Sequence, residues 1–205
     1  MKKSILPVLA VGAVVMLASC DSRQKLSEEL QGIWAGTPEQ LTNSGAARAT
    51  MVRMMEFTST GDAGEGNVTL TAYITVENTM PANDSIVTPL TISASGTATI
   101  TGLYQAKDDD DLMLNLDASS FTVNVDSDGV ELSYNVLTED SGSHLTSLRP
   151  AAAMLASQQI DHAARSVFFN LSEIEDIKVN NNMLKCEMNH KDLTFRRQAA
   201  AIPAE

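Results

Sequence analysis

Strict alternation of apolar and polar side chains is the sequence feature that most constrains how this chain can fold. Between residues 67 and 77 apolar positions alternate with polar ones, half of them threonine, which is the pattern of a β-strand with one buried and one solvated face. The same period of two recurs in shorter runs that begin near residue 51 and end near residue 197. The apolar positions of these runs are Met51, Met55, Phe57, Val68, Leu70, Ala72, Ile74, Val76, Leu90, Ile92, Ala94, Ala98, Ile100, Leu112, Leu114, Leu116, Phe121, Val123, Val125, Val130, Leu132, Tyr134, Val136, Ile177, Val179, Leu184, Cys186, Met188, Leu193 and Phe195.

Clusters of turn-forming residues separate these runs, at residues 61–67, 81–84, 107–111 and 126–129. Short strands joined by tight turns are typical of an antiparallel meander, because parallel strands need long crossover connections. One helix is expected near residues 148–165, where Pro150 is followed by alanines and other helix formers without alternation. The sequence therefore predicts a mainly β fold, a barrel or a sandwich, with one inserted helix.

The first twenty residues differ from the rest of the chain. Two lysines precede an apolar run over residues 5–18, which is shorter than the ~20 residues that a membrane-spanning helix needs. The run ends in Leu-Ala-Ser-Cys at residues 17–20, and these four residues resemble the lipobox of bacterial lipoproteins. The resemblance implies that residues 1–19 are a signal peptide and that the sulfur of Cys20 carries a diacylglyceryl group. Two or three acyl chains, at roughly 0.8 kcal/mol per buried CH₂, hold a protein on a membrane.

This interpretation divides the chain into four parts. After the signal peptide we expect the lipidated Cys20 and a short polar tether over residues 20–25, then a β-barrel domain over residues 26–198, and a disordered tail over residues 199–205. The expected location is the bacterial cell envelope, with the lipid anchor as the contact with the membrane. We favour the outer membrane over the inner membrane.

The amino-acid composition limits the kinds of molecule that this chain can bind. The 205-residue chain has 26 Asp plus Glu against 14 Lys plus Arg, a formal net charge of -12 at pH 7. Binding to nucleic acid needs clustered lysine and arginine, so we expect no DNA or RNA partner. If Cys20 is acylated, Cys186 has no partner for an intramolecular disulfide, and the fold depends on its apolar core.

Two short segments at the ends of the predicted domain resemble the lipocalin and wider calycin group. Gly32-x-Trp34 follows a short helical segment, as the opening motif of that group does, and residues 193–197, Leu-Thr-Phe-Arg-Arg, resemble its last strand. The resemblance implies a lipocalin-like barrel, here of about eight to ten strands, with Arg196 or Arg197 lying across Trp34 to close the base. In lipocalins the helix follows the eighth strand, whereas the helix predicted here precedes two or three further strands.

A small closed barrel is either filled by side chains or holds one small ligand. The inward positions are mostly aliphatic, so we expect any ligand to be small and apolar or amphipathic. The candidate cavity residues are Met55, Phe57, Leu70, Ile74, Leu114, Phe121 and Tyr134. The alternative is that these seven residues simply form a filled core.

Two groups of residues suggest metal binding, and simpler interpretations are favoured for both. Residues 107–111, Lys-Asp-Asp-Asp-Asp, and 126–129, Asp-Ser-Asp-Gly, carry the carboxylates that calcium needs. The second segment does not fit an EF-hand loop, and both segments are explained as turns. Cys186, Met188 and His190 are spaced two apart and could hold Cu(I), but an apolar strand that enters a turn has the same spacing. His144 and His162 have no ligand at metal spacing. We expect no metal and no cofactor.

No catalytic motif is found in the sequence. Gly-x-Ser-x-Gly, His-Glu-x-x-His, a phosphate-binding glycine loop and Cys-x-x-Cys are all missing. We therefore expect a non-enzymatic envelope lipoprotein that binds a small apolar ligand in its barrel. The alternatives are a structural or adaptor lipoprotein that binds an envelope protein through its outer surface, and an enzyme that acts on envelope polymers through carboxylates brought together in space.

Overall fold

The structure is a computed structural model that describes residues 22–61, 64–83, 88–125, 129–134 and 141–199. Within these residues the fold is mainly β, with 57% strand, and forms a closed antiparallel barrel of eight strands with further strands outside it. The prediction of a mainly β antiparallel barrel with one inserted helix is confirmed. The expected signal peptide and Cys20 lie outside the described residues, as does the predicted tail from residue 200 onward.

The barrel closes through its first strand. β1 (Gly32–Gly36) pairs on one side with β11 (Lys191–Arg197) and on the other with β3 (Ala47–Ser59), so the two ends of the sheet meet there. The ring continues through β10 (Met183–Met188), β9 (Glu173–Asn180), β6 (Leu112–Leu116), β5 (Leu90–Ala106) and β4 (Glu65–Met80).

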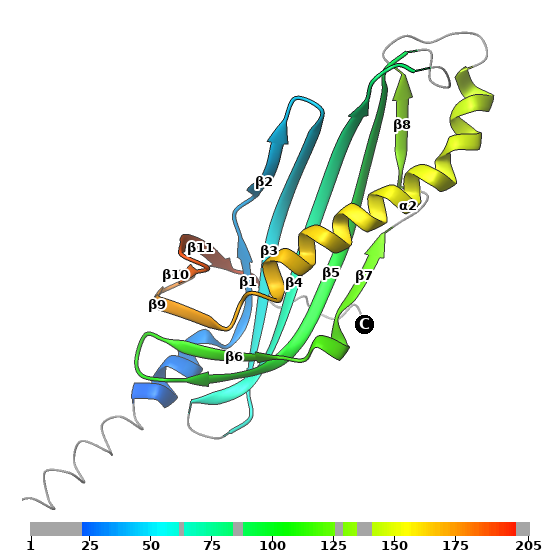
Figure 1. The fold of residues 1–205 in the computed structure, drawn as a ribbon. Helices are drawn as coiled ribbons and strands as arrows, with labels where there is room; N and C mark the ends of the chain where they lie inside the picture. The colour runs from blue at the N-terminus through cyan, green and yellow to red at the C-terminus, as the bar shows by residue number, and fades with distance from the viewer. Residues whose placement is uncertain (1–21, 62–63, 84–87, 126–128, 135–140, 200–205) are drawn as a thin grey trace, which may run out of the picture.

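Three long strands extend beyond the ring. β3, β4 and β5 continue past the barrel as a sheet, to which β2 (Glu39–Ser44) adds along β3, while β7 (Thr122–Val125) and β8 (Glu131–Tyr134) add along β5. A short 3₁₀ helix, η1 (Ala118–Ser120), connects β6 to β7. The molecule therefore has a barrel half and an open-sheet half, which share the same three strands (Figure 1).

Helix α2 (Ser141–Phe168) crosses the open-sheet half (Figure 1). Its buried stripe has a spacing of four residues and is made mostly of alanine, namely Ala152, Ala156, Ile160 and Ala164. Small side chains let the helix lie close to the sheet, where Ile160 reaches Gly96 of β5. The helix extends beyond the predicted range of 148–165 at both ends. It includes Pro150, which has no backbone N–H to donate, and it changes direction in this part (Figure 1).

A helix over residues 22–30 covers the base of the barrel. Residues 22–25, which we expected to belong to a short polar tether, are helical and continue into Leu26. The physical reason is that Leu26, Ser27 and Leu30 bury one face of this helix and stabilise its first turn with it. The hydroxyl groups of Ser27 and Tyr104 are 2.7 Å apart and join the helix to β5.

Large side chains fill the barrel and the space between the open sheet and α2. The largest fully buried ones are Trp34, Tyr104, Phe57, Phe195, Leu30, Met51, Met55, Ile74, Ile100, Leu112, Ile160 and Ile174. The rings of Phe57 and Tyr104 meet edge to face at 5.4 Å, a favourable aromatic geometry. None of the helices in the described part of the chain has the length and apolar character needed to cross a membrane.

Candidate functional site

The base of the barrel is closed by Trp34 and Arg197, which are directly paired across β1 and β11. The guanidinium of Arg197 lies 4.2 Å from the centre of the indole ring, a cation–π geometry. Its Nη2 donates a hydrogen bond of 2.6 Å to the carbonyl of Glu29, and its Nη1 donates one to the carbonyl of Gln31. A cation is favourable here, because these carbonyls lie at the C-terminal end of the helix. The neighbouring Arg196 is exposed.

The seven candidate cavity residues fall into two groups. Five of them, Met55, Phe57, Leu70, Ile74 and Leu114, are buried in the apolar core. The other two, Phe121 and Tyr134, are partly buried and pack against the core from the β7 and β8 side.

A groove of about 670 Å³ lies outside the closed ring, between α2 and the sheet formed by β2, β3 and β4. The turn between β10 and β11 forms its remaining wall. Its lining residues are Leu41, Thr42, Ala47, Arg48, Ala49, Arg53, Val76, Glu77, Gln159, His162, Ala163, Ser166, Val167, Asn170, Asn189, His190 and Lys191. None of the seven candidate cavity residues is among them. The volume is in the usual range for small-molecule sites.

The groove is lined by both apolar and polar side chains, on the sheet as well as on α2. The inward positions of β3 and β4 contribute Ala47, Ala49 and Val76, whose side chains are small or aliphatic. Helix α2 contributes a stripe next to its buried one, with Ala163 and Val167 apolar and the rest polar. A site of this kind fits a molecule with an apolar part and a polar part.

Arg53 is the buried charge of this groove. It takes an inward position of β3 between Met51 and Met55, and its side chain is only 6% exposed. Nε donates a hydrogen bond of 2.6 Å to Oε1 of Glu39, and Nη2 donates one of 3.1 Å to Oε2 of the same carboxylate. The third nitrogen, Nη1, is buried and has no hydrogen-bond partner among the described residues. An arginine with an unused buried donor is exceptional, because such donors are nearly always satisfied.

The other charged groups of the groove lie at its rim. Arg48 faces Glu77 at 3.9 Å, and both side chains are largely exposed, so this ion pair contributes little to stability. His190 Nδ1 lies 3.4 Å from Glu187 Oε1, a contact that is ionic only when the histidine is protonated. Asn189 and His190 both have φ above zero, as a two-residue hairpin turn of type I′ requires. Lys191 begins β11 directly after this turn.

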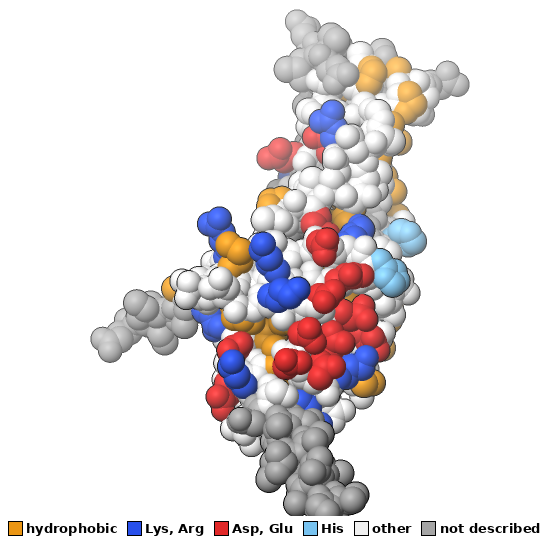
Figure 2. Space-filling model, turned by 90° about the vertical axis from the view of Figure 1, so that its left-hand side faces the viewer, with side chains coloured by type: hydrophobic (Ala, Val, Ile, Leu, Met, Phe, Trp, Pro, Cys, Tyr) orange, Lys and Arg blue, Asp and Glu red, His pale blue; other side chains and the backbone are white. Residues whose placement is uncertain are grey.

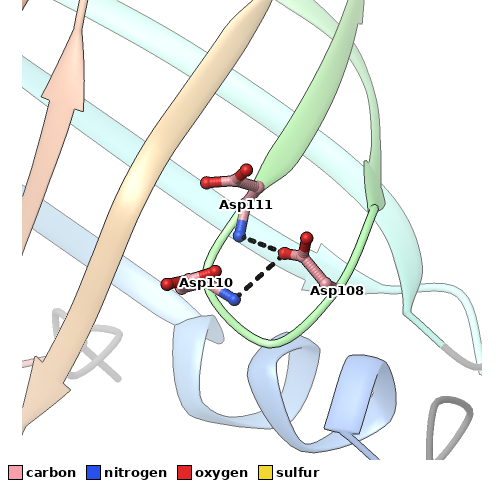
Figure 3. A group of neighbouring side chains, drawn as sticks. All are labelled: Asp108, Asp110 and Asp111. Carbon is pink, nitrogen blue, oxygen red and sulfur yellow. Dashed lines mark hydrogen bonds between the residues drawn. The ribbon is translucent and has the colours of Figure 1, made fainter.

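The aspartate run forms the turn between β5 and β6. Oδ1 of Asp108 accepts hydrogen bonds from the backbone N–H of Asp110 and Asp111, at 3.3 and 3.0 Å (Figure 3). Carboxylate oxygens of Asp108, Asp110 and Asp111 lie within 4.8 Å of one another. Burial and the neighbouring aspartates raise the pKa of Asp110. The hydrogen bonds support the interpretation as a turn, and residues 126–128 of the second acidic segment lie outside the described part of the chain.

Acidic side chains extend from this turn over the same side of the barrel (Figure 2). The backbone N–H of Asp176 donates to Asp111 Oδ1 at 3.2 Å, so β9 brings Glu173, Glu175 and Asp176 close to the run. Lys107 forms an ion pair of 3.1 Å with Glu173. This side of the barrel is therefore strongly negative.

The structure does not bring the three candidate copper ligands together. Cys186 and Met188 are buried in the core, whereas the side chain of His190 is 96% exposed in the turn. Burial raises the pKa of the Cys186 thiol to about 12, although the nearby Arg53 acts in the opposite direction. The thiol is protonated at neutral pH and is a poor nucleophile. The side chain of His144 lies outside the described residues, and His162 lines the groove.

Sequence reasoning missed Arg53 and Glu39. One signal was present, because Arg53 interrupts the apolar positions of its strand between Met51 and Met55. A charged residue at an inward position needs a partner. Its partner could not be found from the sequence, since Glu39 has no distinguishing pattern around it.

Comparison with known proteins does not assign this chain to a family. No protein-family model matches the chain, and no curated protein is similar to it at a significant level.

Proposed function

We propose that this protein is a lipid-anchored, non-enzymatic protein of the bacterial cell envelope that binds a small amphipathic molecule. The observation that carries the proposal is the groove of about 670 Å³ under α2, with its apolar wall and its buried arginine. A β-barrel fold is compatible with ligand binding. The binding site is proposed at this groove, because large side chains fill the barrel half.

The anchor would lie at the barrel base, and the groove under the C-terminal part of α2, which ends near the middle of the molecule (Figure 1). If Cys20 carries the lipid, a single residue separates it from the helix over residues 22–30, which covers the barrel base. The base then faces the bilayer closely. Helix α2 crosses the half of the molecule away from that helix, so the groove would be reached from the aqueous side (Figure 1).

An adaptor function has less support. Among the described residues the large exposed apolar side chains are Tyr73, Leu103, Met113, Met154, Phe169 and Met183. They come from six different elements or loops, and Leu103 and Met113 are diagonal neighbours across β5 and β6. Apolar residues that are exposed singly are normal on soluble domains. A groove with a defined volume favours a small ligand over a protein partner.

Native mass spectrometry of the full chain, released from membranes in a mild detergent, tests ligand binding. We expect a co-purified adduct of lipid size. The variant Ala163→Trp fills the groove and should lose the adduct, whereas Ala151→Trp places the same side chain on an exposed position of α2 and should keep it. An adduct that survives Ala163→Trp, or wild-type protein without any adduct, would contradict the proposed site.

The lipid anchor is tested separately by cell fractionation. The wild-type chain should sediment with membranes and lose this association when a lipoprotein lipase removes its acyl chains. Cys20→Ser should abolish incorporation of labelled fatty acid. A Cys20→Ser chain that still incorporates the label would show that the lipid is attached elsewhere.

A further inference from the structure

We propose that the ligand of the groove is an amphipathic monocarboxylate, whose head group accepts a hydrogen bond from Arg53 Nη1 and whose chain lies along the apolar wall. This inference rests on the proposed function, since it names the chemical class of the molecule that the same groove binds. It goes further by assigning the recognition of that molecule to one nitrogen atom.

Arg53 has one hydrogen-bond donor that no other group of the described residues uses. Arg53 is more than nine-tenths buried, and it lines the groove. Glu39 occupies Nε and Nη2, one of the edges of the guanidinium that can hold both oxygens of a carboxylate, and leaves Nη1 without a partner among the described residues. A buried donor without an acceptor is unfavourable, so an oxygen supplied by a ligand would stabilise the protein.

The charged side chains that line the groove favour a head group with a single negative charge. Both arginines that line the groove already face a carboxylate, Arg53 with Glu39 and Arg48 with Glu77. Lys191 and two histidines remain as further lining groups that can carry positive charge. With both histidines neutral, Arg48, Arg53 and Lys191 exceed Glu39 and Glu77 by one positive charge, which one carboxylate balances, whereas a phosphate dianion would need a protonated histidine as well. A carboxylate also makes the stronger, charge-assisted type of hydrogen bond with a guanidinium.

The apolar side chains that line the groove favour a ligand with a hydrocarbon chain. Ala47, Ala49 and Val76 on the sheet face Ala163 and Val167 on α2 across the groove. These side chains offer no directional contact, so they fit a hydrocarbon chain rather than a sugar or a peptide. The rest of this acidic chain would repel an anion, which makes the groove the favourable place for one.

Photolabelling of the full chain in its native membranes tests this. The probes are a medium-chain fatty acid with a diazirine in its chain and the alcohol of the same length, and mass spectrometry locates the labelled peptides. We expect the acid to label β3 and α2 peptides at lower concentration than the alcohol does. In the double variant Glu39→Gln/Arg53→Gln, the half-saturating concentration of the acid should rise at least about tenfold, while that of the alcohol should stay the same.

Matched variants separate the effect of the site from general effects. Asp161→Asn/Arg165→Gln removes an arginine–carboxylate pair that is exposed and outside the groove, and should change neither probe. Glu39→Gln alone leaves Arg53 without its counter-charge and should lower the half-saturating concentration of the acid. If the double variant does not fold, as judged by Trp34 fluorescence, Arg53→Lys replaces it, because lysine keeps the charge next to Glu39 but loses the planar donor group.

The outcomes distinguish this inference from the proposed function. Equal labelling of the groove by acid and alcohol, unaffected by the double variant, would overturn the carboxylate inference and leave the ligand-binding groove intact. An absence of groove labelling by either probe would overturn both.

Discussion

Arg197 makes three contacts at the barrel base, and all of them depend on its guanidinium. The group stacks on Trp34 and donates to two carbonyls at the end of the preceding helix. Lysine keeps the charge but cannot stack in the same way or span both carbonyls. We predict that Arg197→Lys lowers the free energy of unfolding by about 1 to 3 kcal/mol.

Urea unfolding monitored by fluorescence measures this effect, because Trp34 is the only tryptophan of the chain. The matched control is Arg196→Lys, which changes the exposed neighbour and should leave the midpoint unchanged. An equal loss in both variants would show that the stacked geometry does not contribute.

Deprotonation of the Cys186 thiol makes the free energy of unfolding depend on pH in the alkaline range. Burial raises its pKa from 9.0 to about 12, so the folded state holds the thiol proton more tightly than the unfolded state does. The sign follows from this difference: the stabilising contribution is complete below the unfolded pKa and is lost as the pH rises from about 9 toward about 12. We predict that wild-type protein loses more stability across this window than Cys186→Ala does.

Urea midpoints of the two proteins, measured at several pH values from neutral upward, check this prediction. Other groups that titrate in the window are common to both proteins and cancel in the comparison. Parallel curves would contradict the raised pKa.

At the scale of elements, the alanine stripe of α2 sets how close the helix lies to the sheet. Ala156 is 1% exposed, so a larger side chain has no space without moving the helix. We predict that Ala156→Leu lowers the free energy of unfolding by about 1 to 3 kcal/mol, since overpacking a well-packed interface is destabilising. Ala151→Leu, on the exposed side of the same helix, should change it little. Circular dichroism during thermal unfolding separates the two variants, and equal melting temperatures would contradict the close packing.

Most of the elements follow from period two, because each strand buries one face in a continuous core. The first helical turn, residues 22–25, was not predicted because its side chains are polar. The helical spacing of apolar residues begins only at Leu26, where the buried face begins. The groove escaped prediction for a different reason. It is formed where α2 approaches β2 and β3, and no local pattern in the sequence encodes the distance between residues 41–53 and 159–170, which are more than a hundred residues apart.

At the scale of the whole molecule, the barrel half and the open-sheet half share their main strands. β4 alone spans 16 residues and β5 spans 17, and their pairing is unbroken from Glu65 opposite Gln105 to Met80 opposite Leu90. The apolar side chains of both halves belong to one core cluster. Because the two halves share continuous strands and one core, unfolding of either half removes packing from the other, which favours a single cooperative transition.

We therefore predict that probes in the two halves report the same unfolding midpoint. Trp34 reports on the barrel base, and a maleimide dye on Met154→Cys reports on α2, since position 154 is 63% exposed. The dye should spare Cys186, whose thiol is buried and protonated. If the dye signal changes at lower urea concentration than Trp34 fluorescence does, α2 detaches before the barrel unfolds. The groove would then be a separately opening unit. Coincident transitions would instead mean that a ligand bound under α2 stabilises the entire chain, barrel base included.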